Sequence, residues 1–206
     1  MSLTNYTDLQ TAVSNWMARS DLTTVIPDFI TLFESVANRT LRIRQMETTT
    51  PLTTSGGSVA LPSDYLDWRG LSWSNGTTSS QIEFVHPTYL GADYPTSTTI
   101  SGRPARVFTI QGGNILVRPY DDSANALSFD YYQKIPGLAA NSTNWLMTAW
   151  PDLYLAGTLV EAYGYVKDYD QVNFWGARRQ GLFGEIQAAD ALNRGPSVVK
   201  NLGPTP

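Results

Sequence analysis

The chain has no cysteine and a single histidine. Without thiols it can form no disulfide bond, offer no thiolate nucleophile and bind no metal through cysteine. One imidazole cannot supply the second histidine of a common zinc site. His86 precedes a proline, which favours an extended loop or strand end, so a structural or surface role is a better interpretation than a general base.

Other catalytic and ligand-binding motifs are also missing. There is no phosphate-binding glycine loop ending in lysine and no glycine-rich dinucleotide fingerprint. Asp168-Tyr169-Asp170 opens like a calcium loop, but Asn173 stands where its glycine is needed and Arg179 where its bidentate glutamate belongs. We therefore expect no catalytic residue, no cofactor and no metal site.

Basic residues and long apolar runs are scarce. Lys and Arg number 14 against 18 Asp and Glu, which gives a net charge of -4. Proteins that grip DNA through many phosphate contacts carry a basic surface, so tight binding to nucleic acid is disfavoured. No apolar run reaches membrane-spanning length, and the N-terminus lacks the basic and hydrophobic regions of a signal peptide. These absences predict a soluble protein made in a cytoplasm, without a membrane partner.

Helical patterns are strongest near the C-terminus, where residues 144–193 predict two long helices joined by a polar break at residues 167–170. Pro151 and Asp152 suit the first turn of the first helix, which is apolar around most of its girth and should be central. Asp170 is the expected cap of the second helix, and Gly195 with Pro196 should end it.

The second of these helices carries small residues at helical spacing. Each interior glycine costs an exposed helix about 1 kcal/mol relative to alanine, so such glycines indicate that another backbone comes close. Packing within the chain and packing against a neighbouring subunit both remain open. The candidate subunit-interface residues are Ala177, Gly181, Gly184 and Ala188.

Helices are also expected at the N-terminus and strands in the middle. Thr7-Asp8-Leu9-Gln10 has the form of a capping box, and Pro27 should begin a longer helix. From about residue 48 to residue 135, Thr, Ser, Gly and Pro become dense and short β-rich runs alternate with turn signals. Gly112-Gly113 predicts a two-residue hairpin turn that pairs Phe108 with Val117 and Ile110 with Ile115.

These patterns predict an α+β fold in which a helical bundle, formed by the N- and C-terminal segments, carries an inserted antiparallel β domain. The expected bounds are residues 1–47 and 144–195 for the helical domain, and 48–143 for the β domain. Residues 196–206 should form an extended C-terminal arm. Aromatic residues are concentrated in or next to the β region, mostly at alternating positions, which favours a buried role over an exposed sugar-stacking surface.

Several segments, taken in order, resemble a known family, the head-to-tail adaptor (connector) proteins of short-tailed bacteriophages, related to the tail tubular protein A type. The likeness extends over nearly the whole chain, and it is the order and spacing of the segments that is specific. The segments are Tyr6-Thr7-Asp8-Leu9, Ile26-Pro27-Asp28-Phe29-Ile30, Arg39-Thr40-Leu41-Arg42, Leu61-Pro62-Ser63-Asp64-Tyr65-Leu66, Gly102-Arg103-Pro104, Asn144-Trp145-Leu146, Pro151-Asp152-Leu153-Tyr154-Leu155 and Glu161-Ala162-Tyr163.

The resemblance implies a non-enzymatic structural protein of the virion, located at the head-tail junction. Its helical part would pack side by side into a dodecameric ring beneath the portal protein, its β part would contact the nozzle or other tail proteins, and genome DNA would pass through the lumen without specific binding. The portal-docking candidates are Ser197, Val198, Val199 and Lys200, in an arm that either orders on binding or is a frayed terminus.

Two other functions differ from this one in class. Paired carboxylates and aromatic side chains in the β region would suit a carbohydrate-binding or glycan-cleaving tail protein, if the carboxylates were suitably spaced. A DNA-binding packaging accessory is disfavoured by the charge.

Overall fold

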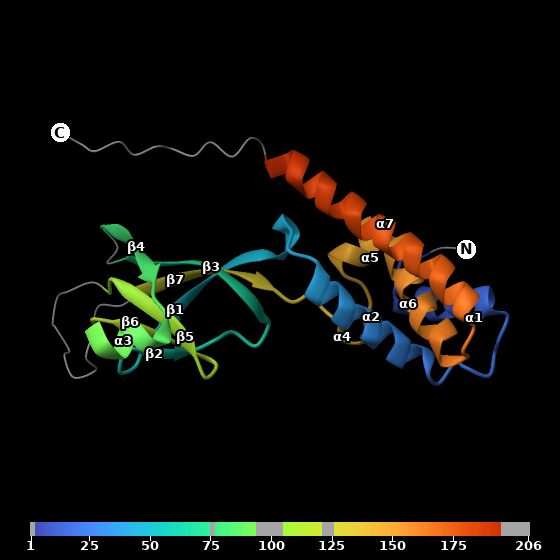
Figure 1. The fold of residues 1–206 in the computed structure, drawn as a ribbon, viewed down its shortest axis with the longest axis horizontal. Helices are drawn as coiled ribbons and strands as arrows, with labels where there is room; N and C mark the ends of the chain where they lie inside the picture. Colours follow the sequence, from blue (N-terminus) through green and yellow to red (C-terminus); the bar gives the residue numbers. More distant parts are fainter. Residues whose placement is uncertain (1–2, 75–76, 94–104, 121–125, 195–206) are drawn as a thin grey trace. The chain divides into compact units, whose positions relative to one another are not determined.

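A computed structural model describes residues 3–74, 77–93, 105–120 and 126–194. The chain divides into two compact units (Figure 1). One, the helical unit, comprises Met1–Gln45 and Ile135–Pro206, and the other, the sheet unit, comprises Met46–Lys134.

The helical unit is built from segments that are far apart in the sequence. Its helices are α1 (Tyr6–Met17), α2 (Ile26–Thr40), α4 (Leu138–Asn141), α5 (Trp145–Ala149), α6 (Pro151–Tyr165) and α7 (Tyr169–Arg194), and the short 3-10 turn η1 (Arg44–Met46) follows α2. Helices α1, α2, α5 and α7 all contact α6. The unit is therefore organised around α6.

Helix α6 is the central helix that the sequence predicts. Its residues from Leu153 to Val160 are all buried, and the side chain of Tyr154 has no exposed surface. Gly157 lies directly against Phe33 of α2, so a Cβ at this position would overlap the phenyl ring. The close approach of α2 to α6 thus depends on a glycine.

Two helix starts differ from the sequence prediction. Helix α1 begins at Tyr6, with Asn5 rather than Thr7 as its cap, and the Asn5 side chain accepts a hydrogen bond from the Asp8 backbone N–H at 2.9 Å. Helix α7 begins at Tyr169, and it is the Asp168 carboxylate that accepts from the Gln171 N–H, at 3.2 Å. In both cases another residue with a short oxygen-bearing side chain, two positions earlier, caps the helix equally well.

The sheet unit contains strands β1 (Glu47–Thr53), β2 (Ser58–Ala60), β3 (Tyr65–Ser74), β4 (Ser79–Phe84), β5 (Val107–Gln111), β6 (Asn114–Arg118) and β7 (Ala126–Gln133), with helix α3 (Pro87–Asp93) between β4 and β5. Their order in the sheet is β1-β7-β3-β4-β5-β6-β2. The predicted hairpin is confirmed as β5 and β6, with Phe108 opposite Val117 and Ile110 opposite Ile115. Gly112 and Gly113 have positive φ angles of 59° and 79°, as the turn requires.

The predicted fold class, with its helical bundle and inserted antiparallel β domain, is wrong. Strands β4 and β5 run parallel, with Glu83 opposite Val107 and Phe84 opposite Phe108, so the seven-stranded sheet is mixed. Parallel neighbours need a crossover of a dozen or more residues, which the chain between these strands supplies, including α3. Within its described residues the protein is an α+β chain with seven α-helices and a mixed sheet.

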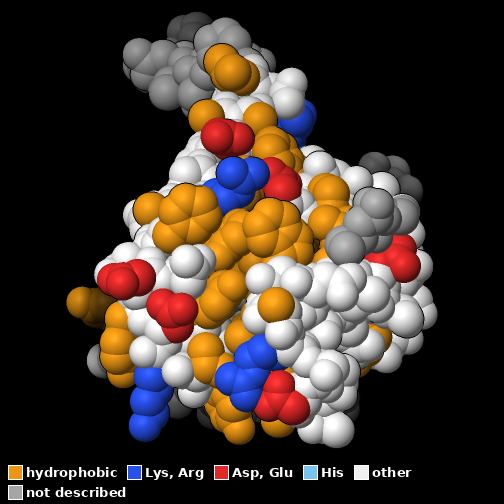
Figure 2. Space-filling view, turned by 90° about the vertical axis from the view of Figure 1, so that its right-hand side faces the viewer, with side chains coloured by type: hydrophobic (Ala, Val, Ile, Leu, Met, Phe, Trp, Pro, Cys, Tyr) orange, Lys and Arg blue, Asp and Glu red, His pale blue; other side chains and the backbone are white. Residues whose placement is uncertain are grey.

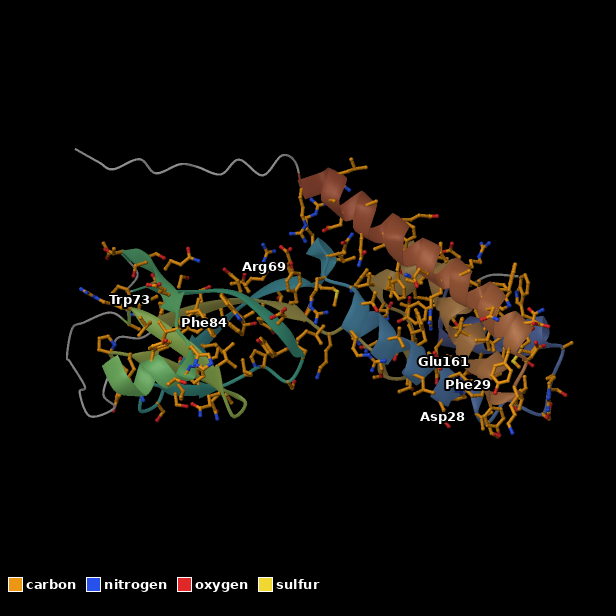
Figure 3. The ribbon with its side chains drawn as sticks, viewed as in Figure 1. Asp28, Phe29, Arg69, Trp73, Phe84 and Glu161 are labelled. Carbon is orange, nitrogen blue, oxygen red and sulfur yellow. The ribbon has the colours of Figure 1, made fainter. Side chains whose placement is uncertain are left out.

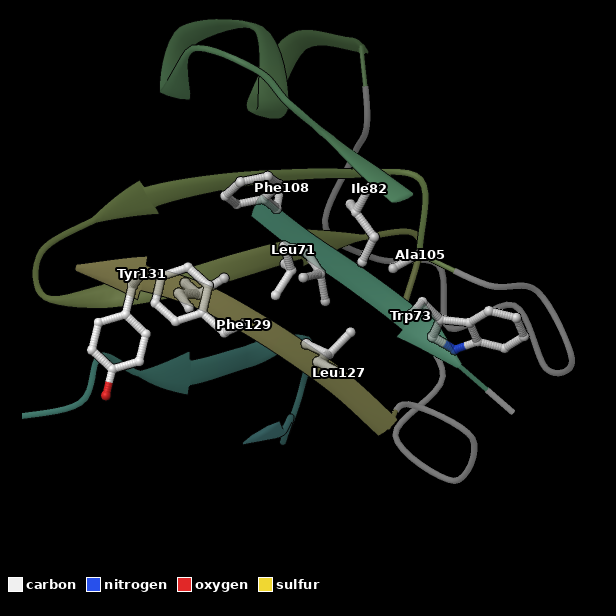
Figure 4. Close-up of a cluster of buried hydrophobic side chains, with 10 residues drawn as sticks. Leu71, Trp73, Ile82, Ala105, Phe108, Leu127, Phe129 and Tyr131 are labelled. Carbon is white, nitrogen blue, oxygen red and sulfur yellow. The ribbon is translucent and has the colours of Figure 1, made fainter. Parts of the chain in front are cut away.

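One face of the sheet carries the core of this unit (Figure 4). Leu71, Phe108 and Phe129 are almost completely buried there, together with Trp73 and Tyr131. The predicted burial of the aromatic residues is therefore correct for Trp73 and Tyr131, whereas Trp68 and Tyr89 are exposed.

Candidate subunit-contact surface

Helix α7 has a buried inner face and an exposed outer face. The residues on the inner face, Trp175, Leu182, Phe183 and Ile186, are buried. An ion pair at 3.3 Å between Arg179 and Glu161 joins the helix to α6. The inner face thus belongs to the core of the helical unit.

The last turns of α7 are attached through a buried carboxylate. Asp190 accepts hydrogen bonds from the Arg44 backbone N–H at 3.1 Å, from the Arg44 guanidinium at 3.2 Å and from Arg194 at 2.6 Å. Burial by itself would raise the pKa of Asp190, but the hydrogen bonds from Arg194 and Arg44 outweigh it and hold the pKa below its usual value. No sequence pattern indicates the contact with Arg44, because the two residues are far apart along the chain.

The outer face of α7 carries the predicted small residues. Ala177, Gly181, Gly184 and Ala188 are all exposed. A Cβ built at Gly181 or at Gly184 meets no described atom outside the helix's own nearby backbone within 4 Å. Packing within the described part of the protomer therefore does not explain these two glycines, although they lie inside a helix of 26 residues.

Larger side chains extend the same outer face. Phe174, near the start of α7, is 60% exposed, and Leu192, near its end, is 84% exposed. Residues 174, 181, 188 and 192 recur at intervals of seven and four, so they share one side of the helix. Arg178 and Glu185 are exposed along the same side. The outer face thus combines apolar ends, a small-residue centre and one charge of each sign.

A second group of exposed aromatic rings lies where α1 meets the start of α7. Trp16 is 54% exposed and packs edge-on against Trp175, with ring centroids 5.2 Å apart. Phe174 also packs edge-on against Trp175, with ring centroids 5.2 Å apart. Figure 2 shows one face of the helical unit, on which hydrophobic side chains gather between charged ones. Apolar side chains gathered in this way on a protein surface commonly mark a contact with another protein.

Glu34 of α2 fixes the loop that leads into α4. Its Oε1 accepts a hydrogen bond from the Leu138 backbone N–H at 2.8 Å and one from the Tyr154 hydroxyl at 3.3 Å. Asn144 donates to the same hydroxyl at 2.6 Å. Burial raises the pKa of Glu34 despite these hydrogen bonds. No sequence motif marks Glu34, although an acid beside Phe33 on an otherwise apolar stripe is a signal that points to it.

A polar groove of about 710 Å³ lies on the sheet unit. It is lined by Glu47, Thr48, Thr49, Arg69, Gly70, Gln81 and Asp130. Arg69, labelled in Figure 3, forms an ion pair with Glu47 and lies over the ring of Tyr132. The hydroxyl of Thr49 donates to Asp130 at 2.5 Å. The groove thus presents hydrogen-bond donors, acceptors and charges of both signs.

The remaining candidate residues from the sequence are those of the C-terminal arm and His86. Ser197, Val198, Val199 and Lys200 lie outside the described residues. His86 is exposed, and its Nδ1 lies 3.0 Å from the Thr88 hydroxyl in a local turn. Among the described residues, no three His, Asp or Glu side chains gather in a way that could hold a metal ion. In the same part of the chain, no helix has both the length and the apolarity to cross a membrane.

An exposed helix face with apolar, small and charged residues is typical of a protein that assembles with other proteins. The chain matches the SU10 adaptor protein family over residues 4–200, and it belongs to this family. The resemblance to phage head-to-tail adaptors is thereby confirmed, and the chain is a structural adaptor protein of a bacteriophage. No curated protein matches the chain.

Proposed function

We propose that this adaptor forms a closed homo-oligomeric ring, dodecameric as in the family it resembles, that joins the portal to the tail of the virion. The observation that carries the proposal is the outer face of α7, where a Cβ at Gly181 or Gly184 would meet no described atom outside the helix's own backbone within 4 Å, while Phe174 and Leu192 are exposed. In a lone protomer this face holds apolar side chains in water, and covering it with a neighbour is favourable.

Each part of the chain has its own role in the proposed assembly. The helical unit makes the ring, and the sheet unit, Met46–Lys134, contacts the nozzle or other tail proteins. The arm of residues 196–206 docks on the portal through Ser197, Val198, Val199 and Lys200. Genome DNA passes through the lumen, and the net charge of -4 suits a conduit that must not retain DNA.

The test is to image the purified full chain by electron microscopy, alone and with the phage's portal protein, and to weigh the particles by mass photometry. We expect rings of one copy number, formed alone or on the portal. A protein that stays monomeric under both conditions and never binds portal contradicts the proposal.

The polar groove of the sheet unit favours a second candidate, a carbohydrate-binding or glycan-cleaving tail protein. Its carboxylates, amide and hydroxyls are groups that bind sugar hydroxyls. A glycan array and a hydrolysis assay on host surface polysaccharides separate the two functions. Binding or cleavage that is lost in an Asp130→Ala variant supports the glycan role, and silence on all polysaccharides removes it.

A further inference from the structure

Helix α2 also presents an exposed side. Asp28, Leu32, Ser35 and Arg39 recur at intervals of three, four and seven residues and are exposed, whereas Phe29, Ile30 and Phe33 on the other side are buried. Leu32 is 52% exposed. The outer side of α2 is thus one protruding apolar side chain between an acid and a base.

This side of α2 is complementary to the outer face of α7 when the two helices are aligned in parallel. If Leu32 lies over Gly181, Asp28 comes about 6 Å before it along the axis and Arg178 about 4.5 Å before, so their opposite charges face each other. Arg39 comes about 10.5 Å after Leu32 along the axis, and Glu185 comes about 6 Å after Gly181. The long Arg39 side chain spans the axial offset between these two residues. An antiparallel alignment would instead oppose Asp28 to Glu185 and Arg39 to Arg178.

The protomer itself supplies the parallel alignment. Three contacts join α7 to α2 and the segment after it, and the residue numbers on both sides rise together from one contact to the next. The ring of Phe33 stacks with that of Phe183, Gln187 donates to the Thr40 carbonyl, and Arg44 binds Asp190. The two helices therefore run in the same direction (Figure 1). If the ring axis lies along these helices, rotation about it preserves their direction, and a neighbour's α2 arrives parallel to α7.

The two outer sides also point away from the unit's own core. Helices α2 and α7 both pack on α6, and each turns its exposed side away from it. A head-to-tail ring requires two different surfaces on each protomer that fit one another, in contrast to a two-fold dimer, which uses one surface twice.

We propose that the outer side of α2 in one protomer packs against the outer face of α7 in the next, with Leu32 seated over Gly181 and Gly184. Asp28 then pairs with Arg178 of the neighbour, and Arg39 pairs with Glu185. The absence of side chains at the two glycines lets the helices approach closely at the point where Leu32 enters. This inference rests on the ring proposed above and names the contact that builds it.

The first test uses the lack of cysteine in the chain. Leu32→Cys and Gly181→Cys are made in separate full-length chains, mixed, assembled with portal and treated with a short bis-maleimide cross-linker. We expect cross-linked dimers in the mixture, none with either variant alone, and a ladder of higher oligomers when both cysteines are in one chain.

The matched control replaces Gly181→Cys by Ala140→Cys, which lies at an exposed position on α4. Assembled rings that cross-link no better in the Leu32–Gly181 mixture than in this control contradict the proposed contact but leave the ring itself intact. A chain that forms no ring with or without portal contradicts the proposed function, and this contact with it.

The second test exchanges charges across the contact. Asp28→Arg and Arg178→Asp should each raise the protein concentration needed for half-assembly by about tenfold, because each opposes like charges across the interface. The double variant Asp28→Arg with Arg178→Asp should return assembly to near the original concentration. Thermal melting by circular dichroism checks that each variant is folded, and equal assembly of all folded variants overturns the pairing.

Discussion

Gly157 and Gly181 lie in adjacent helices of one unit but in opposite surroundings. A Cβ at Gly157 would overlap the ring of Phe33, whereas a Cβ at Gly181 meets no described atom within 4 Å. The first glycine is therefore needed for packing within the protomer. The second lowers the helix propensity of α7 and makes no close packing contact with the described part of the protomer, which favours a role in assembly.

Replacing each glycine by alanine should separate these roles. We expect Gly157→Ala to lower the free energy of unfolding by about 2 kcal/mol or more through overpacking against Phe33. Gly181→Ala should raise the free energy of unfolding by about 0.5–1 kcal/mol, because alanine favours the helix. Urea unfolding followed by circular dichroism measures both. Equal effects of the two substitutions would contradict the assigned surroundings.

Glu34 should make stability depend on pH in the opposite sense to a typical surface carboxyl. Because its folded-state pKa is raised above the ordinary value of 4.5, the folded protein holds this proton more tightly than the unfolded chain. The free energy of unfolding should therefore fall as pH rises from about 4.5 through the raised pKa. The substitution Glu34→Gln keeps an acceptor oxygen for Leu138 and Tyr154 but introduces a side chain that does not titrate.

The measurement is urea unfolding of both proteins at several pH values from 4 upward. The difference in unfolding free energy between the original protein and Glu34→Gln cancels the other carboxyls and should decrease across this range. A difference that is constant with pH would show that Glu34 is not held in its protonated form by burial.

At the scale of the element, helix α7 packs along its inner face, and ion pairs supplement this packing in two places. Its first half packs through Trp175 and the Arg179–Glu161 pair, and its last turns depend on Asp190 and the two arginines that bind it. Gly181 and Gly184 lie between these two attachments. The inner face of the helix is thus attached along its length, while its outer face is exposed.

Asp190→Ala should loosen the end of α7. Losing the acceptor for Arg44 and Arg194 should cost about 1–2 kcal/mol, a modest value because both arginines are partly exposed. Since the pKa of Asp190 is lowered, this contribution is present above about pH 3.8 and is lost as pH falls through the lowered pKa. Hydrogen exchange of the last turns of α7 measures the effect.

In the unassembled protomer, Glu185→Ala is the matched control for Asp190→Ala, because Glu185 is an exposed acid on the same helix. Its replacement should change stability by no more than about 0.5 kcal/mol. Equal loss of exchange protection in the two variants would mean that the Asp190 contacts do not anchor the helix.

At the scale of the whole molecule, sequence patterns predicted what is local and missed what depends on distant partners. The hairpin of β5 and β6 followed from Gly112-Gly113, because a two-residue turn fixes its own register. The parallel pairing of β4 with β5 could not be predicted, because alternation of apolar residues shows which face of a strand is buried but not the direction in which the strand runs.

The candidate surface shows the same division. The small residues of α7 could be read from their helical spacing, and their exposure in the protomer could not. Leu32, Arg178 and Glu185 drew no attention in the sequence, because an exposed leucine or charge is ordinary by itself. Their order becomes informative only when α2 and α7 are known to run in the same direction.

The division into two units leads to a last prediction about the whole molecule. Both helix faces proposed for the ring belong to the helical unit, whereas the polar groove belongs to the sheet unit, which we propose contacts tail proteins. Arg69→Glu places two acidic side chains together in the groove beside Glu47. Because these side chains lie on an exposed polar surface, we expect normal folding and normal rings on the portal, but at least about tenfold weaker recruitment of tail proteins.

Pull-down of tail proteins by portal-bound rings measures this recruitment. The Asp28→Arg variant is the opposite case, because there the assembly of the ring itself is weakened. Rings of the Arg69→Glu variant that recruit tail proteins normally would exclude the groove from that contact, and a loss of rings would contradict the separation of roles between the units.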